Sequence, residues 1–204
     1  QYVIGHGGMG VVFAAHDGSR GTAVALKTLQ VTSAAAIARL KREFRMVQGL
    51  EHPGLVRLGE LWADGSHAYF TMELLEGVDL LSWLRGPEGP RLARFAPALR
   101  QLGDALEHLH AAGVVHNDLA KEPNWLVAPD GSPAVVDFQL AMRPRYRGWR
   151  FRVLAYDDLR HLLKHKRTYC PERLTARQRA ILARRSWPGA ICPRNARTLP
   201  SSSA

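Results

Sequence analysis

Three glycines near the N-terminus constrain the fold more than any other feature of the sequence. Gly5, Gly7 and Gly10 have the spacing G-x-G-x-x-G, and apolar runs at 2–5 and 10–15 lie on either side of it. Glycine lets a backbone approach a phosphate group closely and point its N–H groups at it. In a dinucleotide-binding fold a helix would follow this motif, whereas here "VVFAA" follows, which reads as a strand. The pattern therefore predicts two strands joined by a phosphate-covering loop.

A third strand and a helix follow, and each places one ionisable side chain. The run "TAVALKTL" (22–29) alternates as a strand does, with Ala25 and Lys27 on one face. Ser33 offers an N-cap for a helix whose apolar residues recur at helical spacing, and Glu43 lies beside that apolar face. A lysine on such a strand can reach the phosphates of a nucleotide when a carboxylate on the neighbouring helix holds it. We therefore expect Lys27 and Glu43 to form an ion pair.

The order of strands and helices predicts an α+β fold in two lobes. Strands at 52–62 and 67–75 complete a five-stranded antiparallel sheet with one helix, which together form a small lobe, residues 1–75. Residues 76–185 are predicted to form a reduced, mainly helical large lobe. Residues 186–204, with three Pro and a run of Ser, are predicted to be a disordered tail.

Apolar periodicity and boundary residues predict the elements of the large lobe. Helices are expected at 79–85, in a long segment that contains Leu99 and Leu109 and ends at Gly113, at 156–166 and at 175–185. The run "WLVAPDGSPAVVDF" (125–138) predicts a hairpin around an Asp-Gly turn. Asp157 and Asp158 would cap the helix at 156–166 and pair with its basic residues.

The stretch "VVHNDLAKEPNWLV" (114–127) is typical of a phosphoryl-transfer catalytic loop. Asp118 would accept the proton of an attacking hydroxyl or orient that hydroxyl, and Asn124 would bind a metal. The usual pattern places this Asn five residues after the Asp, but here it lies six residues after. The extra residue falls between Asp118 and Lys121. We expect it to bulge outward without moving Asp118 or Asn124.

The sequence Asp137-Phe138-Gln139 follows the hairpin at the place where a D-F-G motif is expected. Asp137 would chelate Mg²⁺ or Mn²⁺ that bridges the phosphates. Carboxylate and amide oxygens suit hard ions of this kind. Gln139 replaces a glycine, which removes backbone freedom. We therefore expect this segment to hold one conformation.

These motifs together resemble those of the protein-kinase-like superfamily. Residues 1–85, with "GGMGVVF" and "VALK", are similar to the small lobe of bacterial serine/threonine protein kinases. Residues 108–167, with "HNDLAKEPNWLV", "VDFQLA" and "DLRHLLKHKR", are similar to small bacterial RIO-like and lipopolysaccharide-kinase-like proteins. The resemblance covers roughly four fifths of the chain and implies a two-lobed ATP-dependent kinase fold.

The resemblance also implies a role for each matching residue. The implied catalytic residues are Asp118, Lys27, Glu43 and Lys121; the implied ATP-binding residues are Gly5, Gly7, Gly10, Val12, Ala25, Lys27, Met72, Glu73 and Leu75; and the implied metal ligands are Asn124 and Asp137. Met72 would gate the back of the adenine pocket. Glu73 to Leu75 would form the hinge that hydrogen-bonds adenine.

Three departures from the kinase pattern bear on regulation and on the acceptor. Asn117 replaces the Arg that, in many kinases, pairs with a phosphorylated activation loop, so we expect no switching by phosphorylation of that loop. No A-P-E motif follows Asp137, and only 67 residues remain after it. The usual peptide-docking platform is therefore not expected, which leaves the protein acceptor open.

Basic charge is concentrated in one part of the chain. Residues 143–185 hold 14 Lys or Arg against 3 Asp or Glu, whereas residues 1–142 hold 12 against 15. Within 143–167 the arginines alternate with Tyr146, Trp149 and Phe151. Such interleaving suits contact with an anionic lipid surface, a phosphorylated saccharide or nucleic acid, the last without a supporting motif. The alternative is a solvated basic surface beside the ATP phosphates.

Other features bear on location and redox state. No run of about 18 or more apolar residues is present, so the sequence predicts no transmembrane segment. We expect a cytoplasmic protein, with the inner face of the membrane as the alternative location. Cys170 and Cys192 make no metal signature and are expected to be reduced thiols.

Three functional interpretations remain open. A serine/threonine protein kinase is favoured, because the small lobe is the better match to a defined group. A lipopolysaccharide kinase that phosphorylates a saccharide hydroxyl is the second. A pseudokinase or nucleotide-binding scaffold, or an incomplete fragment, is the third, and it is motivated by the shifted loop, Gln139 and the short second half. The presence of Lys27, Glu43, Asp118, Asn124 and Asp137 together weighs against it.

Overall fold

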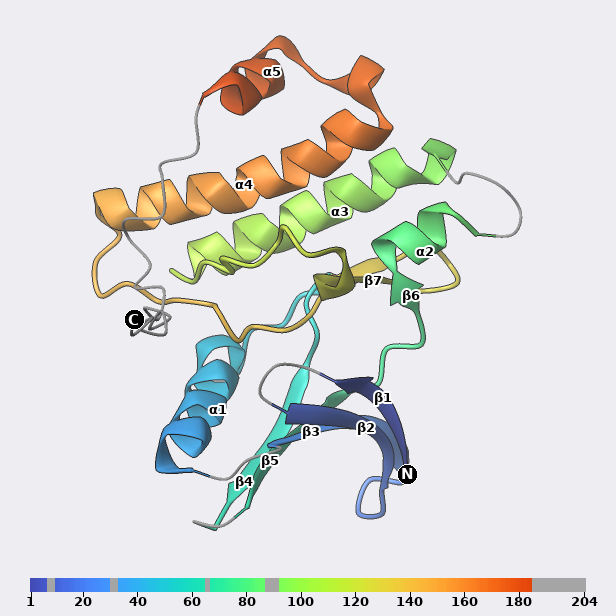
Figure 1. Cartoon of the computed structure of the whole chain (residues 1–204), viewed down its shortest axis with the longest axis vertical. Coiled ribbons are helices and arrows are strands. Elements are labelled where there is room, and N and C mark those ends of the chain that lie inside the picture. The colour runs from blue at the N-terminus through green and yellow to red at the C-terminus, as the bar shows by residue number, and fades with distance from the viewer. Residues whose placement is uncertain (7–9, 30–32, 65–66, 87–91, 185–204) are drawn as a thin grey trace, which may run out of the picture.

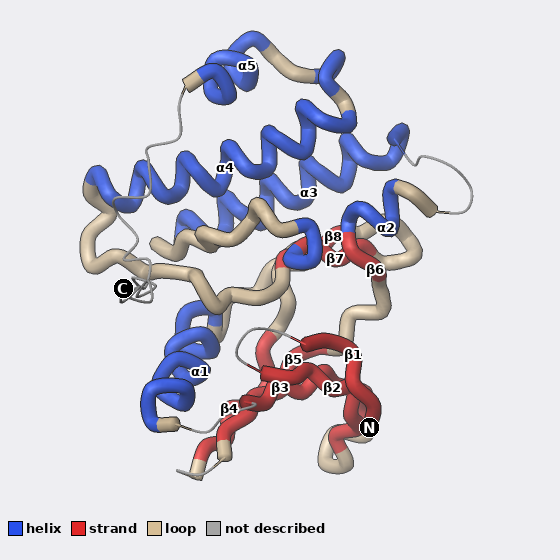
Figure 2. The backbone as a smooth tube through the Cα atoms, viewed as in Figure 1, coloured by secondary structure: helices blue, strands red, loops and turns tan. Residues whose placement is uncertain are grey.

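A computed structural model describes residues 1–6, 10–29, 33–64, 67–86 and 92–184. Figure 1 shows a strand-rich lobe with one helix below a mainly helical lobe, and Figure 2 shows how strands and helices separate between them. The predicted α+β, two-lobed architecture is confirmed.

The small lobe is built on an antiparallel sheet of five strands in the order β1-β2-β3-β5-β4. The strands are β1 (Tyr2–His6), β2 (Gly10–Asp17), β3 (Thr22–Leu29), β4 (Leu58–Ala63) and β5 (Ala68–Glu73). β3 lies at the centre of the sheet, where Lys27 pairs with Val12 of β2 on one side and with Phe70 of β5 on the other. Because side chains alternate along a strand, Ala25 and Lys27 face the same way, and both are buried.

The helix α1 (Ala34–Val47) packs against both lobes. Ser33 caps its N-terminus by accepting a hydrogen bond from a backbone N–H, as predicted. Phe44 packs in the small-lobe core beneath the sheet, whereas Val47, one turn later, packs in the core of the large lobe. Glu43 directly precedes Phe44, lies about one turn before Val47, and is buried. The position of Glu43 therefore depends on both cores.

The large lobe contains a second, three-stranded sheet and four α-helices among the described residues. Its elements are β6 (Val78–Asp79), α2 (Leu80–Leu84), α3 (Leu92–Ala111), the 3-10 turn η1 (Glu122–Asn124), β7 (Trp125–Val127), β8 (Pro133–Val135), α4 (Trp149–Tyr169), the 3-10 turn η2 (Pro171–Arg173) and α5 (Ala176–Ala183). The predicted hairpin is present as β7 and β8, and Gly131 takes the positive φ that its turn requires. Helices α3 and α4 lie side by side (Figure 1).

The prediction for α4 was wrong at its N-terminal end. The helix begins at Trp149, not near residue 156, so Asp157 and Asp158 lie in its interior and cap nothing. Arginine is a good helix former, so the basic run continues the helix without a break. Phe151 fixes this added part, since its side chain is buried and its ring contacts the ring of His110 on α3. Gly148 occupies the N-cap position.

The rest of the chain adds little to the site. Cys170 is a free, buried thiol whose pKa is raised by burial, whereas Cys192 and the predicted disordered tail 186–204 lie outside the described residues. Across the described residues we find no helix that is both long and apolar enough to span a bilayer.

Candidate active site

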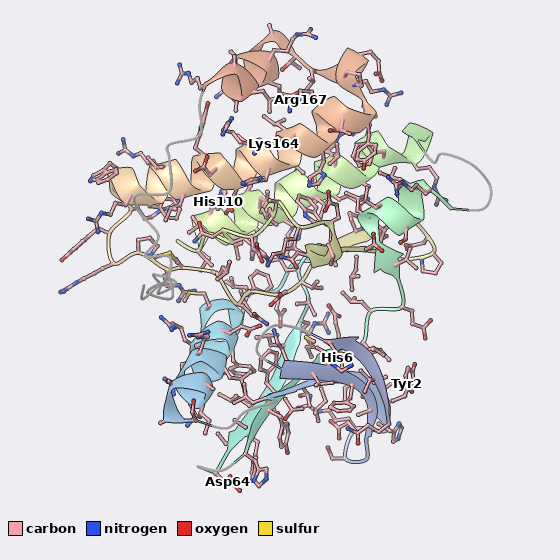
Figure 3. All side chains as sticks on the ribbon, viewed as in Figure 1. Tyr2, His6, Asp64, His110, Lys164 and Arg167 are labelled. Atoms are coloured by element: carbon pink, nitrogen blue, oxygen red, sulfur yellow. The ribbon has the colours of Figure 1, made fainter. Side chains whose placement is uncertain are left out.

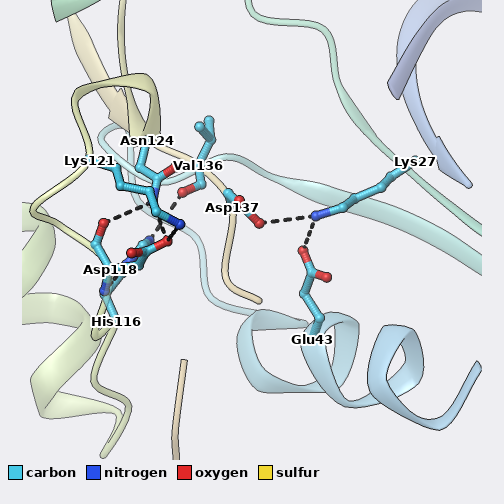
Figure 4. Close-up of polar contacts among 8 residues, drawn as sticks. All are labelled: Lys27, Glu43, His116, Asp118, Lys121, Asn124, Val136 and Asp137. Carbon is cyan, nitrogen blue, oxygen red and sulfur yellow. Dashed lines mark hydrogen bonds and ion pairs between the residues drawn. The ribbon is translucent and has the colours of Figure 1, made fainter. Parts of the chain in front are cut away.

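Lys27 joins two carboxylates that come from different lobes. Its Nζ lies 2.6 Å from Glu43 Oε1 on α1 and 3.1 Å from Asp137 Oδ1, just after β8 (Figure 4). The lysine and glutamate are almost fully buried, with exposed fractions of 6% and 5%. A charge buried to this extent is stable only when it is paired. The ion pair predicted from the sequence is therefore present, and it extends to the large lobe.

The buried pair leaves one carboxylate oxygen of Glu43 without a partner. Glu43 Oε2 is inaccessible to solvent and accepts no hydrogen bond from the described residues. Burial raises the pKa of Glu43, and the charge of Lys27 opposes that shift only in part. The ionised form of Glu43 is thus maintained mainly by Lys27.

Asp118 accepts hydrogen bonds from two other side chains of the catalytic loop. Lys121 donates to Asp118 Oδ2 at 2.7 Å, and the Asn124 amide donates to the Asp118 carbonyl oxygen at 2.9 Å and to its Oδ2 at 3.2 Å. The bond to Asp118 is the main cause that raises the pKa of Lys121. The extra residue of the loop is accommodated in the turn before Lys121, where Leu119 is buried and Ala120 is exposed. Both Lys121 and Asn124 reach Asp118 in spite of the longer spacing.

Asp158 of α4 supports this loop, a role that was not predicted from the sequence. Asp158 of α4 is 1% exposed and accepts hydrogen bonds from the backbone N–H groups of His116, at 2.8 Å, and Asn117, at 2.9 Å. His110 of α3 lies 3.0 Å from the same carboxylate, and Figure 3 places it where α3 faces α4. Phe151, Asp158, Leu162 and His165 share the buried face of α4, so a longer predicted helix would have identified Asp158.

Asp137 and Asn117 both occupy a backbone conformation that few residues adopt. Their φ angles are 61° and 65°, in the left-handed region, where Asn and Asp are among the better-tolerated residues. The Phe138 ring packs against the ring of His116 at a centroid distance of 4.9 Å. His116 also contacts the carbonyl of Val136 through its Nε2, and burial lowers its pKa. A neutral, fully buried imidazole therefore holds the segment around Asp137 against the catalytic loop.

A cavity of about 360 Å³ opens between the sheet and the large lobe. Its walls include residues that the sequence analysis assigned to nucleotide or metal: Gly5, Val12, Ala25, Lys27, Glu43, Met72, Glu73, Leu75, Asn124 and Asp137. Most of the remaining lining is aliphatic, which suits a planar base. Gln139 and Asp79, which the sequence analysis did not assign to ATP, also line this cavity, and Asp79 caps α2.

The three glycines of the loop differ in what the structure requires of them. A Cβ at Gly10 would lie 1.9 Å from the Thr28 carbonyl oxygen of β3, so glycine is needed there for strand packing. A Cβ at Gly5 would make only an ordinary contact with Val12. Gly7 lies outside the described residues. Gly10 does not line the cavity. Glycine is needed at this position for the packing of β2 against β3.

Oxygen atoms suited to a divalent cation face the cavity from two residues. Asn124 uses its amide nitrogen to bind Asp118, which leaves its carbonyl oxygen available, and Asp137 uses only one carboxylate oxygen for Lys27. Both residues line the cavity. Such oxygens fit Mg²⁺ or Mn²⁺, which take their remaining ligands from phosphate and water. Among the described residues no cluster of three or more His, Cys, Asp or Glu forms a separate metal site.

The basic segment 143–167 is only partly available for an external contact. Arg143 donates to the Met46 carbonyl of α1, and Arg147 donates to two carbonyls at the C-terminal end of α3. Arg145 and Arg150 instead lie over the rings of exposed aromatic neighbours, at 5.5 and 5.6 Å from the ring centroids. No carboxylate in the described ranges forms an ion pair with these four arginines.

Comparison with known proteins agrees with this geometry. The family model described as protein kinase domain matches residues 1–156. Serine/threonine-protein kinase PknE of Mycobacterium tuberculosis is 38% identical over 144 residues, which are 68% of this chain and 25% of that protein. Serine/threonine-protein kinase pkn2 of Myxococcus xanthus is 38% identical over 123 residues, 58% of this chain and 15% of that protein. A putative CBL-interacting protein kinase 27 of Oryza sativa is 36% identical over 144 residues, 68% of this chain and 35% of that protein.

The chain thus spans between about a seventh and a third of the length of these relatives. The family match covers well over half of the chain, and it includes the strand lysine, the helix glutamate, the catalytic loop and Asp137. The chain therefore belongs to the protein kinase domain family.

Proposed function

We propose that this chain transfers the γ-phosphoryl group of ATP, with Mg²⁺ or Mn²⁺, to a serine or threonine hydroxyl of a protein. The observation that carries the proposal is the connection Glu43–Lys27–Asp137, which joins the two lobes across the cavity. An arrangement of this kind orients the phosphates of a nucleotide and neutralises the charge that develops on them. A bound divalent cation would supply further charge neutralisation.

Each residue of the proposed active site then has a distinct role. Lys27 binds the α- and β-phosphates, and Glu43 orients Lys27. Asp118 accepts a hydrogen bond from the acceptor hydroxyl and takes its proton at a carboxylate oxygen. Lys121, which already contacts Asp118, stabilises the negative charge of the transferred group. Asn124 and Asp137 hold the cation.

The acceptor is proposed to be a protein, because the relatives found are named serine/threonine-protein kinases. Arg145 and Arg150, which have no carboxylate partner among the described residues, favour an acceptor with acidic residues near its hydroxyl. A lipopolysaccharide acceptor rests only on the resemblance of residues 108–167 and on the basic segment 143–167.

The test is release of ADP from ATP by the purified chain and by Asp118→Asn, with nucleotide binding followed in parallel. We expect metal-dependent turnover that falls about 10² to 10⁴-fold in Asp118→Asn, because the hydroxyl loses its proton acceptor, while ATP binding is retained. A protein substrate and lipopolysaccharide are supplied separately. Binding without turnover on either acceptor would favour a pseudokinase and contradict the proposal.

A further inference from the structure

The segment that follows Asp137 is short and is bound to the catalytic loop at two points. Only residues 138–148 separate Asp137 from α4. Met142 and Val115 exchange two backbone hydrogen bonds, each 2.9 Å long, as an antiparallel bridge. The side-chain amide of Asn117 donates to the Leu140 carbonyl oxygen at 3.1 Å. The segment therefore runs beside the catalytic loop and contacts it at two successive points.

Asn117 connects three parts of the large lobe. Its backbone N–H donates to Asp158 of α4, its φ of 65° turns the chain, and its side chain reaches Leu140. Asparagine suits this position because it tolerates the left-handed conformation and carries a donor on a short, neutral side chain. An arginine at this position would carry a longer, charged group suited to a phosphate.

A second contact joins the same segment to the small lobe. Arg143 Nη2 donates to the Met46 carbonyl oxygen at 3.2 Å. Met46 lies in the last turn of α1, three residues after Glu43, where helix carbonyls lack partners within the helix. A cation at this end also interacts favourably with the helix dipole. The segment therefore contacts the helix that places Glu43 beside Lys27.

We propose that Asn117 and Arg143 are positioning residues that hold segment 138–148 and α1 in the active arrangement without phosphorylation. This inference rests on the proposed kinase function. The sequence supports it independently, since residues 138–148 contain no Ser or Thr that a serine/threonine kinase could modify. A neutral amide at Asn117 thus takes the place of the arginine–phosphate pair that orders this segment in switched kinases.

Substitutions at Asn117 distinguish the contribution of its side chain from that of its backbone conformation. Asn117→Asp keeps the size of the side chain but presents only acceptors to the Leu140 carbonyl. Asn117→Gly keeps access to positive φ but has no side chain. Arg143→Gln removes the contact with α1, and Arg100→Gln, at an exposed position on α3, is the matched control.

The first readout is amide hydrogen exchange, which needs no turnover. We expect the Val115 and Met142 amides to exchange about threefold to tenfold faster in Asn117→Asp and Asn117→Gly, and at the wild-type rate in Arg100→Gln. Amides of the last turn of α1 should exchange faster in Arg143→Gln. Wild-type exchange in all three variants would overturn the proposal, whether or not the chain proves to be a kinase.

The second readout is kinetic. We expect kcat to fall about tenfold in both Asn117 variants while KM for ATP stays within twofold, because the cavity itself is intact. Phosphatase treatment of the wild-type chain should leave kcat unchanged. A large loss of activity after that treatment, or an equal rise of KM in every variant, would overturn the positioning role. If the wild type shows no turnover, the proposed function is wrong. The exchange result alone then tests whether Asn117 and Arg143 position the segment.

Discussion

Glu43 carries a carboxylate that loses its water on folding and keeps its charge only through Lys27. Burial is the largest effect on it and raises its pKa above the ordinary value of 4.5. The second oxygen accepts no hydrogen bond from the described residues, so no donor there offsets the loss of water. Such a residue is costly for stability, and its contact with Lys27 fits a role in holding that lysine.

The raised pKa of Glu43 predicts a pH effect on stability. Because the folded pKa of Glu43 is raised, the folded protein keeps this proton in a range where the unfolded chain has lost it. The contribution of Glu43 to the free energy of unfolding is therefore complete below pH 4.5 and is lost as the pH rises through the folded pKa. Urea unfolding from pH 4 to 8 should show Glu43→Gln gaining stability relative to the wild type as the pH increases.

Turnover should show the opposite trend. Lys27 is oriented only when Glu43 is ionised, so wild-type kcat/KM should fall at pH values below the raised pKa. Glu43→Gln should lose activity at every pH and lack this acidic limb. In the unfolding experiment, the difference in stability between wild type and Glu43→Gln should change with pH. A difference that stays constant from pH 4 to 8 would show that the Glu43 proton is not linked to folding.

At the scale of elements, β2 and β3 approach each other more closely at Gly10 than a side chain allows. The Cβ of an alanine would lie 1.9 Å from the Thr28 carbonyl oxygen, which belongs to rigid backbone. The glycine motif thus has a structural component, because part of its pattern serves the pairing of Gly10 with Leu29. Lys27 lies two residues before Leu29 on the same strand.

We therefore expect Gly10→Ala to lower the free energy of unfolding by about 1–3 kcal/mol through forced separation of the strands. KM for ATP should rise as well, since β3 carries Lys27. Gly18→Ala is the matched control, because a Cβ at Gly18 meets no atom within 4 Å. Equal urea midpoints for the two variants would contradict the close approach of β2 and β3.

Helix α4 shows why one element was only partly predicted. Its arginines obscure the apolar period in its first two turns, and its Asp pair resembles an N-cap. Asp158 becomes intelligible only when the catalytic loop, 41 and 42 residues away in sequence, places two backbone N–H groups against it. A buried carboxylate needs such donors, and local sequence does not reveal them.

Across the protein, charge is distributed unevenly between the two ends of the chain. The basic excess of residues 143–185 lies on α4, α5 and the segment before them. Part of it is used internally by Arg143 and Arg147, and Arg160 is buried. The charge available to an acceptor is therefore smaller than composition suggests, and the exposed Arg145 and Arg150 are part of it.

We expect the double variant Arg145→Gln, Arg150→Gln to raise KM for an acidic protein acceptor about threefold to tenfold at low salt, with KM for ATP unchanged. The difference from the wild type should shrink as ionic strength increases, because exposed charges are screened. Arg167→Gln, exposed in the last turn of α4, is the control. Equal acceptor KM for the double variant and this control would exclude these arginines from acceptor binding.

Local sequence was enough to predict the order of the main strands and helices, the Ser33 cap and the ion pair of Lys27 with Glu43. These features follow from periodicity, boundary residues and motif spacing, which are local properties of the chain. The support of the catalytic loop by Asp158 and the contact of Arg143 with α1 arise only in the folded protein. The same is true of the need for glycine at position 10 in strand packing. Each of these depends on groups brought together by folding from distant parts of the chain, and burial then determines which polar partners they require.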